Sequence, residues 1–389
     1  MAFAPLSVVF DVAYTDAELV NIKSKKVQVY PSAEQRELLR KWMAAARKAY
    51  NDTITYLKQP GTKANWKAIK TQLIHALPDW CKDTPYQIKS LAIREACKAV
   101  SKAKRDFKQK GKFQDCKFRS VKNPQQTIYI PKTAITPDGV YYKLLNRLLA
   151  SEDIRTDSDG SLTYENGRYF LIVGIKTKQA TPSDNQARVV SVDPGIRSFV
   201  SFYSTDCCGK IGLQNFGRIL SLGRHLDNLI SRRTVCKNKR SRHNMRKAER
   251  RLRCKIRDLV DELHHKTAKF LLDNFEVIII PPFETSQMVP KYKRKIGKKS
   301  VRAMMSFAHY RFQEYLKFKA KSLGKVVLNQ NEAYTSKTAS WTGEVKNIGG
   351  AKYIKSDGLV VDRDYNGARG IMLRALCEIS PPLETMVHN

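Results

Sequence analysis

The chain has 389 residues, enough for two or three domains, and its 42% of hydrophobic residues is ordinary for a globular protein. Its 71 Lys and Arg outnumber its 36 Asp and Glu, which gives a formal net charge of +35. Such a surface repels itself unless a polyanion neutralises it, and nucleic acid is the polyanion that binds Lys and Arg most readily. A membrane surface is the rival partner, but no apolar run approaches the roughly 20 residues of a spanning helix, and no signal peptide is expected.

The first 110 residues are mostly helical in pattern. Residues 1–20 show no clear period and are taken as an N-terminal extension, whereas KKVQVY at 25–30 alternates polar and apolar residues as a strand does. Ser32, followed three residues later by Gln35, is typical of a capping box, so a helix is expected to begin there. A second helical block, basic on its exposed side, is expected over about 84–110.

The next segment changes to strand-like pieces separated by turns. KFQDCKFRS, QQTIYI, GVYYKLL and GSLTYENGRYFLIVGI are rich in β-branched and aromatic residues, and the Asn-Gly pair at 166–167 favours a hairpin. Residues 21–32 and 112–185 are therefore predicted to form a β-barrel, with residues 33–111 as a helical insertion within it.

Residues 186–389 predict an α/β domain. RVVSVDPGIRSFVSFYS contains two strands around a tight turn, and KIGLQNFG supplies a third. Helices are expected over about 218–235 and 240–274, then the buried strand EVIII, one helix over KKSVRAMMSFAHYRFQEYLKFKAKSLG, the strand KVVLNQ and a last helix from about 364 to 378. This order is typical of an RNase H-like fold.

Acidic residues stand where these predicted elements end. Asp193 ends an apolar strand and enters a Pro-Gly turn, Glu332 follows KVVLNQN, and Asp362 and Asp364 lie at the start of the last helix. Each alone is consistent with a turn, loop or helix-capping acid. Together, in so basic a chain, they favour a site for divalent metals. Magnesium prefers oxygen ligands, and paired metals stabilise the attacking and leaving oxygens of phosphodiester hydrolysis.

Two motifs, DPGIRSF and DRDYNGARGI, resemble those of a known protein family. The chain resembles the TnpB family of transposon-associated, RNA-guided RuvC nucleases, and most of all its eukaryotic and large-virus relatives, the Fanzor proteins, which are related to type V CRISPR effectors. VYPSAEQRELL with AYN resembles the TnpB opening, and KFRSVKNPQQTIYI resembles a barrel segment, so the resemblance spans nearly the whole chain. It implies a wedge-like barrel domain, a recognition insertion and a RuvC-like nuclease domain at 186–389.

The resemblance assigns catalytic and metal-binding roles to Asp193, Glu332 and Asp364. Asp364 is favoured over Asp362 because the Asp-x-Asn-x-Ala core of the motif begins there. The second acid departs from the TnpB pattern, since EVIII is followed by the uncharged PPF. Glu332, in NEAYTSKT, matches the Fanzor placement, and Glu284 is the local alternative.

The resembled family usually carries a four-cysteine zinc site between TSKT and DRD, but that stretch has no cysteine here. Ala339 and Thr342 occupy the places of the first pair, and Ile354 and Asp357 those of the second. We therefore expect no zinc and a degenerate zinc-finger-like insertion at about 333–361. The chain's eight cysteines form no CxxC pair and are expected to be free thiols.

Basic segments mark candidate nucleic-acid surfaces. Residues 237–257 are rich in Lys and Arg and contain a single acidic residue, Glu249. This composition favours phosphate contacts, for which the candidates are Lys239, Arg240, Arg246, Arg250 and Arg253. In the barrel segment, Arg119, Lys122 and Gln126 are candidate contacts to a nucleic-acid backbone or a short flanking motif. The cluster KYKRKIGKK at 291–299 suggests nuclear import in a eukaryotic or viral setting, and a cytoplasmic or nucleoid location otherwise.

These expectations combine into a Mg²⁺-dependent, RNA-guided DNA endonuclease that uses two Mg²⁺ ions. Its partners would be a guide (omega) RNA and target double-stranded DNA, with no membrane, and the protein would be monomeric in the ribonucleoprotein. Two alternatives stay open: a catalytically inactive RNA- or DNA-binding relative, which the missing cysteines favour, and a transposase with an RNase H-like fold, which strand-transfer products would reveal.

Overall fold

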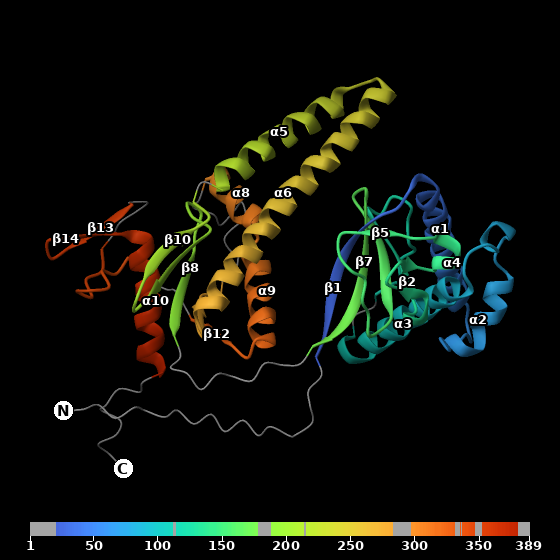
Figure 1. Cartoon of the computed structure of the whole chain (residues 1–389), viewed down its shortest axis with the longest axis horizontal. Coiled ribbons are helices and arrows are strands. Elements are labelled where there is room, and N and C mark those ends of the chain that lie inside the picture. Colours follow the sequence, from blue (N-terminus) through green and yellow to red (C-terminus); the bar gives the residue numbers. More distant parts are fainter. Residues whose placement is uncertain are drawn as a thin grey trace, which may run out of the picture. The chain divides into compact units, whose positions relative to one another are not determined.

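The structure is a computed structural model that describes residues 21–111, 114–177, 188–213, 215–282, 297–330, 335, 337–346 and 352–379. The chain divides into two compact units, Met1–Lys178 and Gln179–Asn389 (Figure 1). Within the described ranges, no helix is both long and apolar enough to cross a lipid bilayer.

The helices of the first unit pack through apolar stripes. α1 (Ala33–Leu57) begins at the predicted capping box, which the structure confirms: the Gln35 N–H donates to Ser32 Oγ at 3.2 Å and the Ser32 N–H donates to Gln35 Oε1 at 2.8 Å. α1 packs against α3 (Tyr86–Lys110), and Trp42 lies almost fully buried in their shared core. The helix α2 (Trp66–His75) and the 3-10 turn η1 (Asp79–Cys81) were not predicted from the sequence.

The first unit also contains a five-stranded antiparallel sheet in the order β2-β6-β7-β1-β5. Its strands are β1 (Asn21–Tyr30), β2 (Gln125–Ile130), β5 (Leu149–Ala150), β6 (Gly160–Glu165) and β7 (Arg168–Thr177). β6 and β7 meet at Asn166 and Gly167, whose φ values of 51° and 90° give the predicted hairpin turn. Pairing among the described strands does not join β2 to β5, so a closed barrel stays a prediction.

Two strand predictions in this unit were wrong. The described part of KFQDCKFRS forms no strand. GVYYKLL contributes only β4 (Gly139–Val140), which pairs with β3 (Ile135–Thr136) after the turn η2 (Lys132–Ala134), and then makes the helical turn α4 (Tyr142–Leu145). Trp42 packs edge-on against Tyr141 at 5.4 Å between ring centroids, so tertiary packing rather than β-propensity governs this segment.

The second unit is built on a five-stranded mixed sheet in the order β10-β9-β8-β11-β12. Its strands are β8 (Val189–Pro194), β9 (Val200–Ser204), β10 (Cys208–Ile211), β11 (Val277–Ile280) and β12 (Val326–Asn329). β8, β9 and β10 are antiparallel neighbours, whereas β11 runs parallel to both β8 and β12. The strands that the sequence predicted are all present, in the order of an RNase H-like sheet.

Helices cover both faces of this sheet (Figure 1). One face packs against α6 (Lys239–Asn274) and α9 (His309–Ser322), and the other packs against α10 (Arg363–Ile379). α5 (Asn215–Val235) lies antiparallel to the first half of α6, and the two form a long hairpin, here called the α5–α6 hairpin.

Two features of this unit differ from the sequence prediction. The single helix expected after residue 297 is broken at Ala308, whose φ of 49° ends α8 (Lys298–Phe307) before α9 begins. No strand was predicted just before the last helix, but the structure has a hairpin there of β13 (Tyr353–Ser356) and β14 (Leu359–Asp362), whose last residue leads directly into α10.

Candidate active site and nucleic-acid interface

Asp193 lies on the face of the central strand that meets α10. Val190 and Val192 of β8 are fully buried against the α6–α9 side, so the alternating residues Ser191 and Asp193 point the other way. The Ser191 hydroxyl donates to the carbonyl oxygen of Ala368 in α10 at 2.7 Å, which fixes this direction. The predicted first acid therefore stands at the end of β8, facing the last helix.

A glycine lets this helix approach the Asp193 carboxylate closely. A Cβ built on Gly367 would lie 2.7 Å from Asp193 Oδ2, which is shorter than any normal contact. Side chains three residues apart share a face of a helix, and Cα–Cβ bonds point toward the helix N-terminus. Asp364, three residues before Gly367, therefore lies one turn away on the face that Asp193 meets. The close approach that the structure shows is that of Gly367 in α10 to Asp193.

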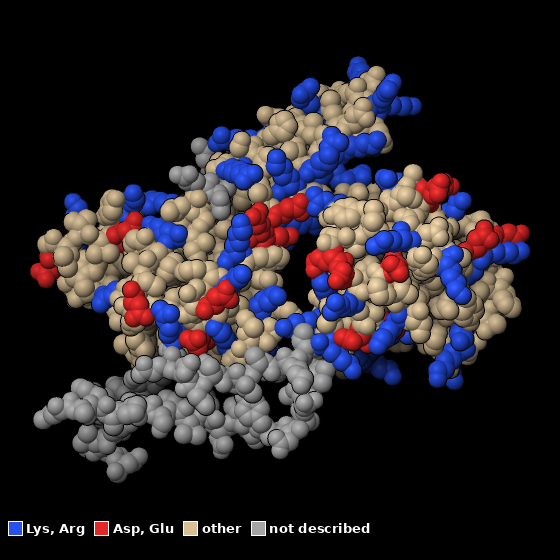
Figure 2. Space-filling view, viewed as in Figure 1, with Lys and Arg blue, Asp and Glu red and all other residues tan. Residues whose placement is uncertain are grey.

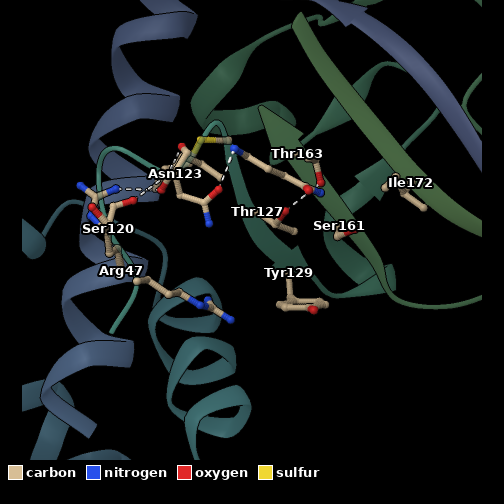
Figure 3. Close-up of a pocket in the computed structure, with 12 residues that line it drawn as sticks. Arg47, Ser120, Asn123, Thr127, Tyr129, Ser161, Thr163 and Ile172 are labelled. Atoms are coloured by element: carbon tan, nitrogen blue, oxygen red, sulfur yellow. Dashed lines mark hydrogen bonds between the residues drawn. The ribbon is translucent and has the colours of Figure 1, made fainter. Parts of the chain in front are cut away.

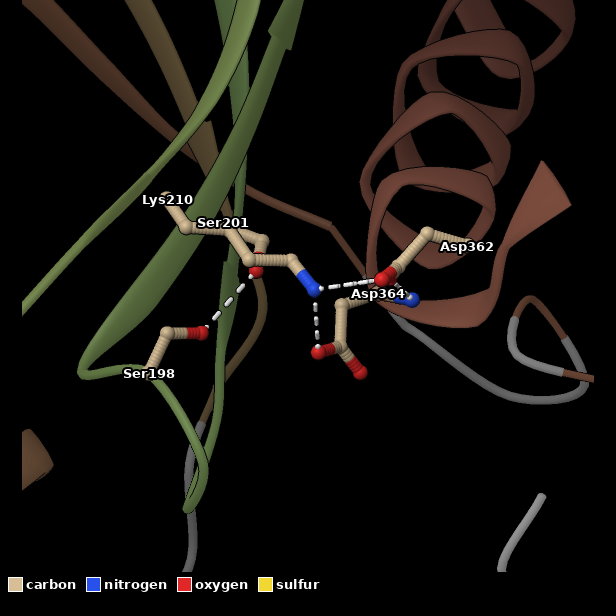
Figure 4. Close-up of polar contacts among 5 residues, drawn as sticks. All are labelled: Ser198, Ser201, Lys210, Asp362 and Asp364. Carbon is tan, nitrogen blue, oxygen red and sulfur yellow. Dashed lines mark hydrogen bonds and ion pairs between the residues drawn. The ribbon is translucent and has the colours of Figure 1, made fainter. Parts of the chain in front are cut away.

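Lys210, from β10, joins the two acids at the start of α10 (Figure 4). Its ammonium donates to both Asp362 oxygens, at 2.7 and 2.8 Å, and to Asp364 Oδ2 at 3.0 Å. Asp362 Oδ1 also accepts the Asp364 backbone N–H at 2.9 Å, so Asp362 caps the helix. Both oxygens of Asp362 are thus engaged by Lys210, whereas the contact from Lys210 to Asp364 uses only Oδ2.

The charges of this group stabilise one another. Burial alone would raise the pKa of Asp362, but hydrogen bonds from Lys210 and from the Asp364 N–H outweigh it and lower that pKa. Burial likewise opposes the charge of Lys210, yet its bonds to Asp362 and Asp364 raise its pKa. Lys210 and Asp362 are therefore charged at neutral pH and form a partly buried ion pair beside Asp364.

Asn366 anchors the first turn of α10 to the segment before it. Its side chain is 1% exposed, accepts the Ser340 N–H at 2.9 Å and donates to the carbonyl oxygens of Thr338 at 2.8 Å and Thr335 at 3.3 Å. Arg369 adds bonds to the Ser340 carbonyl and hydroxyl at 2.6 and 2.8 Å. The position of Asp364 is thus fixed from both sides of its helix turn.

Two buried histidines support the turn that follows Asp193. His309 shares a hydrogen bond of 3.1 Å with the Gly195 carbonyl, and its ring stacks on Phe199 at 4.9 Å between centroids. His264 stacks on the same Phe199 ring and bonds the Phe307 carbonyl at 2.7 Å. Burial lowers the pKa of each histidine to about 4, so both are neutral at pH 7 and each donates through Nε2–H.

The second predicted acid cannot be placed, because both Glu332 and its alternative Glu284 lie outside the described residues. Within the described ranges, no three His, Cys, Asp or Glu side chains gather into a metal-binding group. β12 ends at Asn329, close in sequence to Glu332, and lies two strands from β8 in the sheet. Asp193 and Asp364 supply oxygen ligands of the kind that Mg²⁺ takes, so this donor set fits the metal.

The α5–α6 hairpin carries the predicted phosphate-binding residues. Lys239, Arg240, Arg246, Arg250 and Arg253 are all exposed. The acidic Glu249 is already paired, with Arg253 at 2.9 Å and with Arg233 of α5 at 3.1 Å. Figure 2 shows Lys and Arg gathered along this hairpin. Such a surface favours a polyanion.

The first unit holds a polar cleft of about 420 Å³ that contains two of the three contacts predicted there (Figure 3). The Arg119 guanidinium stacks over the Tyr50 ring at 3.9 Å, and its backbone is held by two bonds with Asn51, of 2.8 and 3.0 Å. Gln126 accepts from Arg47 at 2.9 Å and donates to backbone carbonyls. The lining joins cations to amides and hydroxyls: Arg47, Arg119, Ser120, Asn123, Gln125, Gln126, Thr127, Tyr129 and Thr163.

Several of these functional candidates were missed from the sequence. Arg47 and Lys210 are single basic residues among many, and only the structure shows that one lines the cleft and the other reaches two acids. Gly367 could have been noticed as a glycine within the DRDYNGARGI motif. The exposed Lys122 does not line the cleft. Most of the cluster at 291–299 lies outside the described residues, so nuclear import stays a prediction.

Comparison with known proteins agrees with this geometry. Residues 309–371, which include α9 and most of α10, match the family model "Cas12f1-like, TNB domain". Residues 21–59 match the "Helix-turn-helix domain" model of OrfB from IS605, and in this structure they form β1 and α1. TnpB-like protein L770 of Acanthamoeba polyphaga mimivirus is 24% identical over 92% of this chain and 74% of its own length. The chain is thus similar over nearly its whole length to TnpB-like proteins.

Another viral protein and a solved structure are similar to this chain as well. A625R of Paramecium bursaria Chlorella virus 1, which carries the name transposase, is 23% identical over 91% of this chain and 87% of its own length. Among solved structures, a Cas12f1–sgRNA–target DNA complex matches with a TM-score of 0.50 and 13% identity, covering 90% of this chain and 98% of that one. That likeness concerns the fold alone.

Proposed function

We propose that this protein is an RNA-guided endonuclease that hydrolyses phosphodiesters of target DNA with divalent metals held by Asp193, Glu332 and Asp364. The observation that supports the proposal is the approach of α10 to Asp193 at Gly367, because Asp364 stands in the same helix, three residues before that glycine. A purely structural acid on β8 would not require a glycine opposite it. The third carboxylate is assigned from the sequence alone.

The chain's own residues divide the work at this site. Asp193 and Asp364 would bind the metals, and Asp362 caps the helix and holds Lys210. Two Mg²⁺ ions, when bound, would stabilise the attacking and leaving oxygens of the scissile phosphate. His309 and Asn366 fix the backbone next to Asp193 and Asp364 without reaching the phosphate.

Guide RNA and target DNA are proposed as partners on three grounds. The net charge of +35 calls for a polyanion, and the α5–α6 hairpin offers exposed arginines to phosphates. The polar cleft beside Arg119 offers donors and acceptors of the kind that bind base edges. The Cas12f1 structure similar to this one is a complex with guide RNA and target DNA. We propose a monomer in the ribonucleoprotein.

The proposal is tested by purifying the protein with its bound RNA, sequencing that RNA and offering matching DNA flanked by a randomised library. Asp193→Ala and Asp364→Asn should abolish Mg²⁺-dependent cleavage while RNA stays bound. Asp362→Asn should retain measurable cleavage, because Asp362 is assigned to capping. Asp261→Asn, which removes an exposed acid paired with Arg311, is the matched control and should cleave as wild type.

Other outcomes would point to the alternatives. Bound RNA without cleavage across metals and flanking sequences would favour an inactive nucleic-acid-binding relative. Joined rather than merely cut DNA ends would favour a transposase. Cleavage by Asp193→Ala at the wild-type rate would contradict the assignment of a RuvC-type catalytic site.

A further inference from the structure

The stretch between Thr338 and Asp362 lies where the family that the chain resembles usually carries a zinc site. Zinc needs thiolate or imidazole ligands, and this stretch contains neither Cys nor His. Its residues do not fit that metal. The structure nevertheless gives the described part of the stretch a defined fold, and the bonds that hold it together can be followed one by one.

Two compact turns make up this region. The first, residues 337–346, is here called the first knuckle, and it closes through bonds from the Ala339 N–H to the Glu344 carbonyl at 2.9 Å and from the Gly343 N–H to the Ala339 carbonyl at 2.8 Å. The second knuckle is the β13–β14 hairpin, which turns at Asp357 and Gly358 with φ values of 48° and 70°. In a zinc-bound relative of this design, the metal would join two such turns.

Here a ring of hydrogen bonds joins them. The Ser356 hydroxyl of the second knuckle donates to Glu344 Oε2 at 2.6 Å. Since that uses its only hydrogen, the Thr342 hydroxyl, 3.0 Å away, donates to Ser356 Oγ. The Glu344 N–H donates back to Thr342 Oγ1 at 3.4 Å and closes the ring. The Trp341 indole N–H adds a bond to the Ser356 carbonyl at 3.1 Å.

Apolar side chains fill the remaining places. Ala339 and Ile354, which stand at two of the four expected cysteine places, are each 0% exposed. Thr342, at a third place, belongs to the ring, and Ser356, next to the fourth, is 5% exposed. Three of the four places are thus occupied by two buried apolar side chains and a member of the polar ring, and the fourth, Asp357, is an exposed residue of the β13–β14 turn.

This ring is connected to the candidate active site. The first knuckle is bound to α10 through Asn366, which contacts Thr338 and Ser340, and through Arg369, which contacts Ser340. The second knuckle is covalently continuous with α10, because β14 ends at Asp362 and the helix begins at the next residue. Joining the two knuckles therefore stabilises the start of α10 through both the hydrogen bonds of the first knuckle and the covalent link to the second.

We propose that the ring of Ser356, Glu344, Thr342 and Trp341 replaces a zinc ion, so that this chain holds the two knuckles, and with them the first turn of α10, without any metal there. Ser356 is the central positioning residue because it contacts the other three. That the ring joins the knuckles without zinc does not depend on the proposed nuclease activity. Only the expected effect of the ring on DNA cleavage rests on that proposed function.

The first test is metal content. The full-length protein, purified with its bound RNA after growth in zinc-supplemented medium, should contain far less than one zinc per chain by inductively coupled plasma mass spectrometry. A zinc-selective chelator should leave its thermal midpoint unchanged. A stoichiometric zinc ion, or a midpoint that falls with the chelator, would overturn the proposal.

The second test is substitution of the ring. Ser356→Ala should lower the midpoint by roughly 2–5 °C, since it breaks two side-chain hydrogen bonds of a buried hydroxyl. Ser322→Ala, which removes one local hydroxyl bond at the end of α9, is the matched control and should change it less. If Ser356→Ala does not fold, Thr342→Val removes one link of the ring at an exposed position. A wild-type midpoint in both ring variants would contradict the inference.

A third measurement separates this proposal from the nuclease proposal. Zinc content and thermal midpoints require no cleavage, so they decide the ring even if the protein proves inactive. If the protein cleaves DNA, Ser356→Ala should cleave more slowly at temperatures well below its own midpoint, because Asp364 loses support. Unchanged cleavage there would remove the positioning role of Ser356.

Discussion

At the scale of single residues, Gly367 sets the distance between α10 and the central strand. A methyl group at this position would meet Asp193 Oδ2 at 2.7 Å, so the carboxylate would have to turn aside. We expect Gly367→Ala to keep or slightly raise thermal stability, because Ala favours helix by up to about 1 kcal/mol. Cleavage should fall roughly tenfold or more, since a small displacement of a catalytic group is costly. Single-turnover cleavage and thermal unfolding measure the two effects.

The matched control is Gly217→Ala in α5. A Cβ there would meet no atom within 4 Å, so the same helix-favouring change carries no steric effect. Equal cleavage by the Gly367 and Gly217 variants would show that the close approach has no catalytic importance.

Lys210 supplies the only positive charge that the structure shows touching both Asp362 and Asp364 among the described residues. Lys210→Met leaves two neighbouring carboxylates without their cation and should lower the free energy of unfolding by about 1–3 kcal/mol in the absence of divalent metal. Added Mg²⁺ should restore part of that loss, because a metal bound at the acids again offsets their repulsion. Urea unfolding with and without Mg²⁺ measures both.

Lys266→Met provides the comparison for Lys210. It breaks an exposed pair with Glu262 on the surface of α6, and such pairs contribute little. A Lys210 variant no less stable than this control would mean that the ion pair is unimportant to the fold.

At the residue scale, motifs in the sequence name candidate residues, whereas contacts between distant elements appear only in the structure. Asp193 and Asp364 follow from element ends and the DRDYN motif; the structure shows α10 meeting Asp193 at Gly367, and the catalytic roles of the two acids stay predictions. The Lys210 contact depends on an edge strand returning to the start of α10, which no local pattern encodes. The choice between Asp362 and Asp364 rests on which carboxylate caps the helix, and that is a matter of geometry.

At the scale of elements, the joint between α8 and α9 buries titratable groups. The folded-state pKa of His264 and of His309 is about 4, whereas an unfolded histidine titrates near 6.5. Between these values the unfolded chain binds more protons, so stability is complete above about pH 6.5 and falls as the pH drops toward 4. We expect the urea midpoint to decrease between pH 7 and pH 5.

Substitution should identify the histidines as the source. His309→Gln should flatten this pH dependence, while His265→Gln, at an exposed position of α6, should leave it unchanged. Asp362 and Asp227, whose pKa values are lowered, contribute mainly below pH 4 and do not confuse the comparison. A flat profile in the wild type would contradict the neutral, buried assignment.

The elements themselves were largely predictable. The long helices α1, α3, α5, α6 and α10 and the apolar strands of the second unit appear where hydrophobic spacing placed them, whereas the short α2 was not predicted. The break at Ala308 was missed because alanine is the best helix former, and it is His309, bonded to Gly195, that requires the change of direction. The β13–β14 hairpin was missed because its stability comes from contacts with the first knuckle rather than from its own sequence.

At the scale of the whole molecule, the charge is the dominant property. A net charge of +35 is distributed over both units, but the α5–α6 hairpin concentrates exposed arginines whose neighbouring acid is already paired. Binding to RNA should therefore weaken steeply with salt, since each phosphate contact releases counterions.

The hairpin's share of this effect can be measured. Replacing Arg246 and Arg250 with Gln should reduce RNA affinity and lower the slope of log affinity against log salt by about one to two units. Arg253→Gln should have less effect, because Arg253 is held by Glu249 at 2.9 Å. Filter binding from low to high salt gives both slopes, and identical slopes for all variants would exclude the hairpin as an RNA contact.

The metal-free joining of the two knuckles has a chemical consequence. Peroxide oxidises cysteine thiolates stepwise, and a thiolate that has been oxidised no longer holds zinc. The groups that meet here are two hydroxyls, a carboxylate and an indole, none of which is a sulfur nucleophile. The hydrogen-bonded ring that supports the first turn of α10 should therefore stay intact under oxidising conditions and when zinc is scarce.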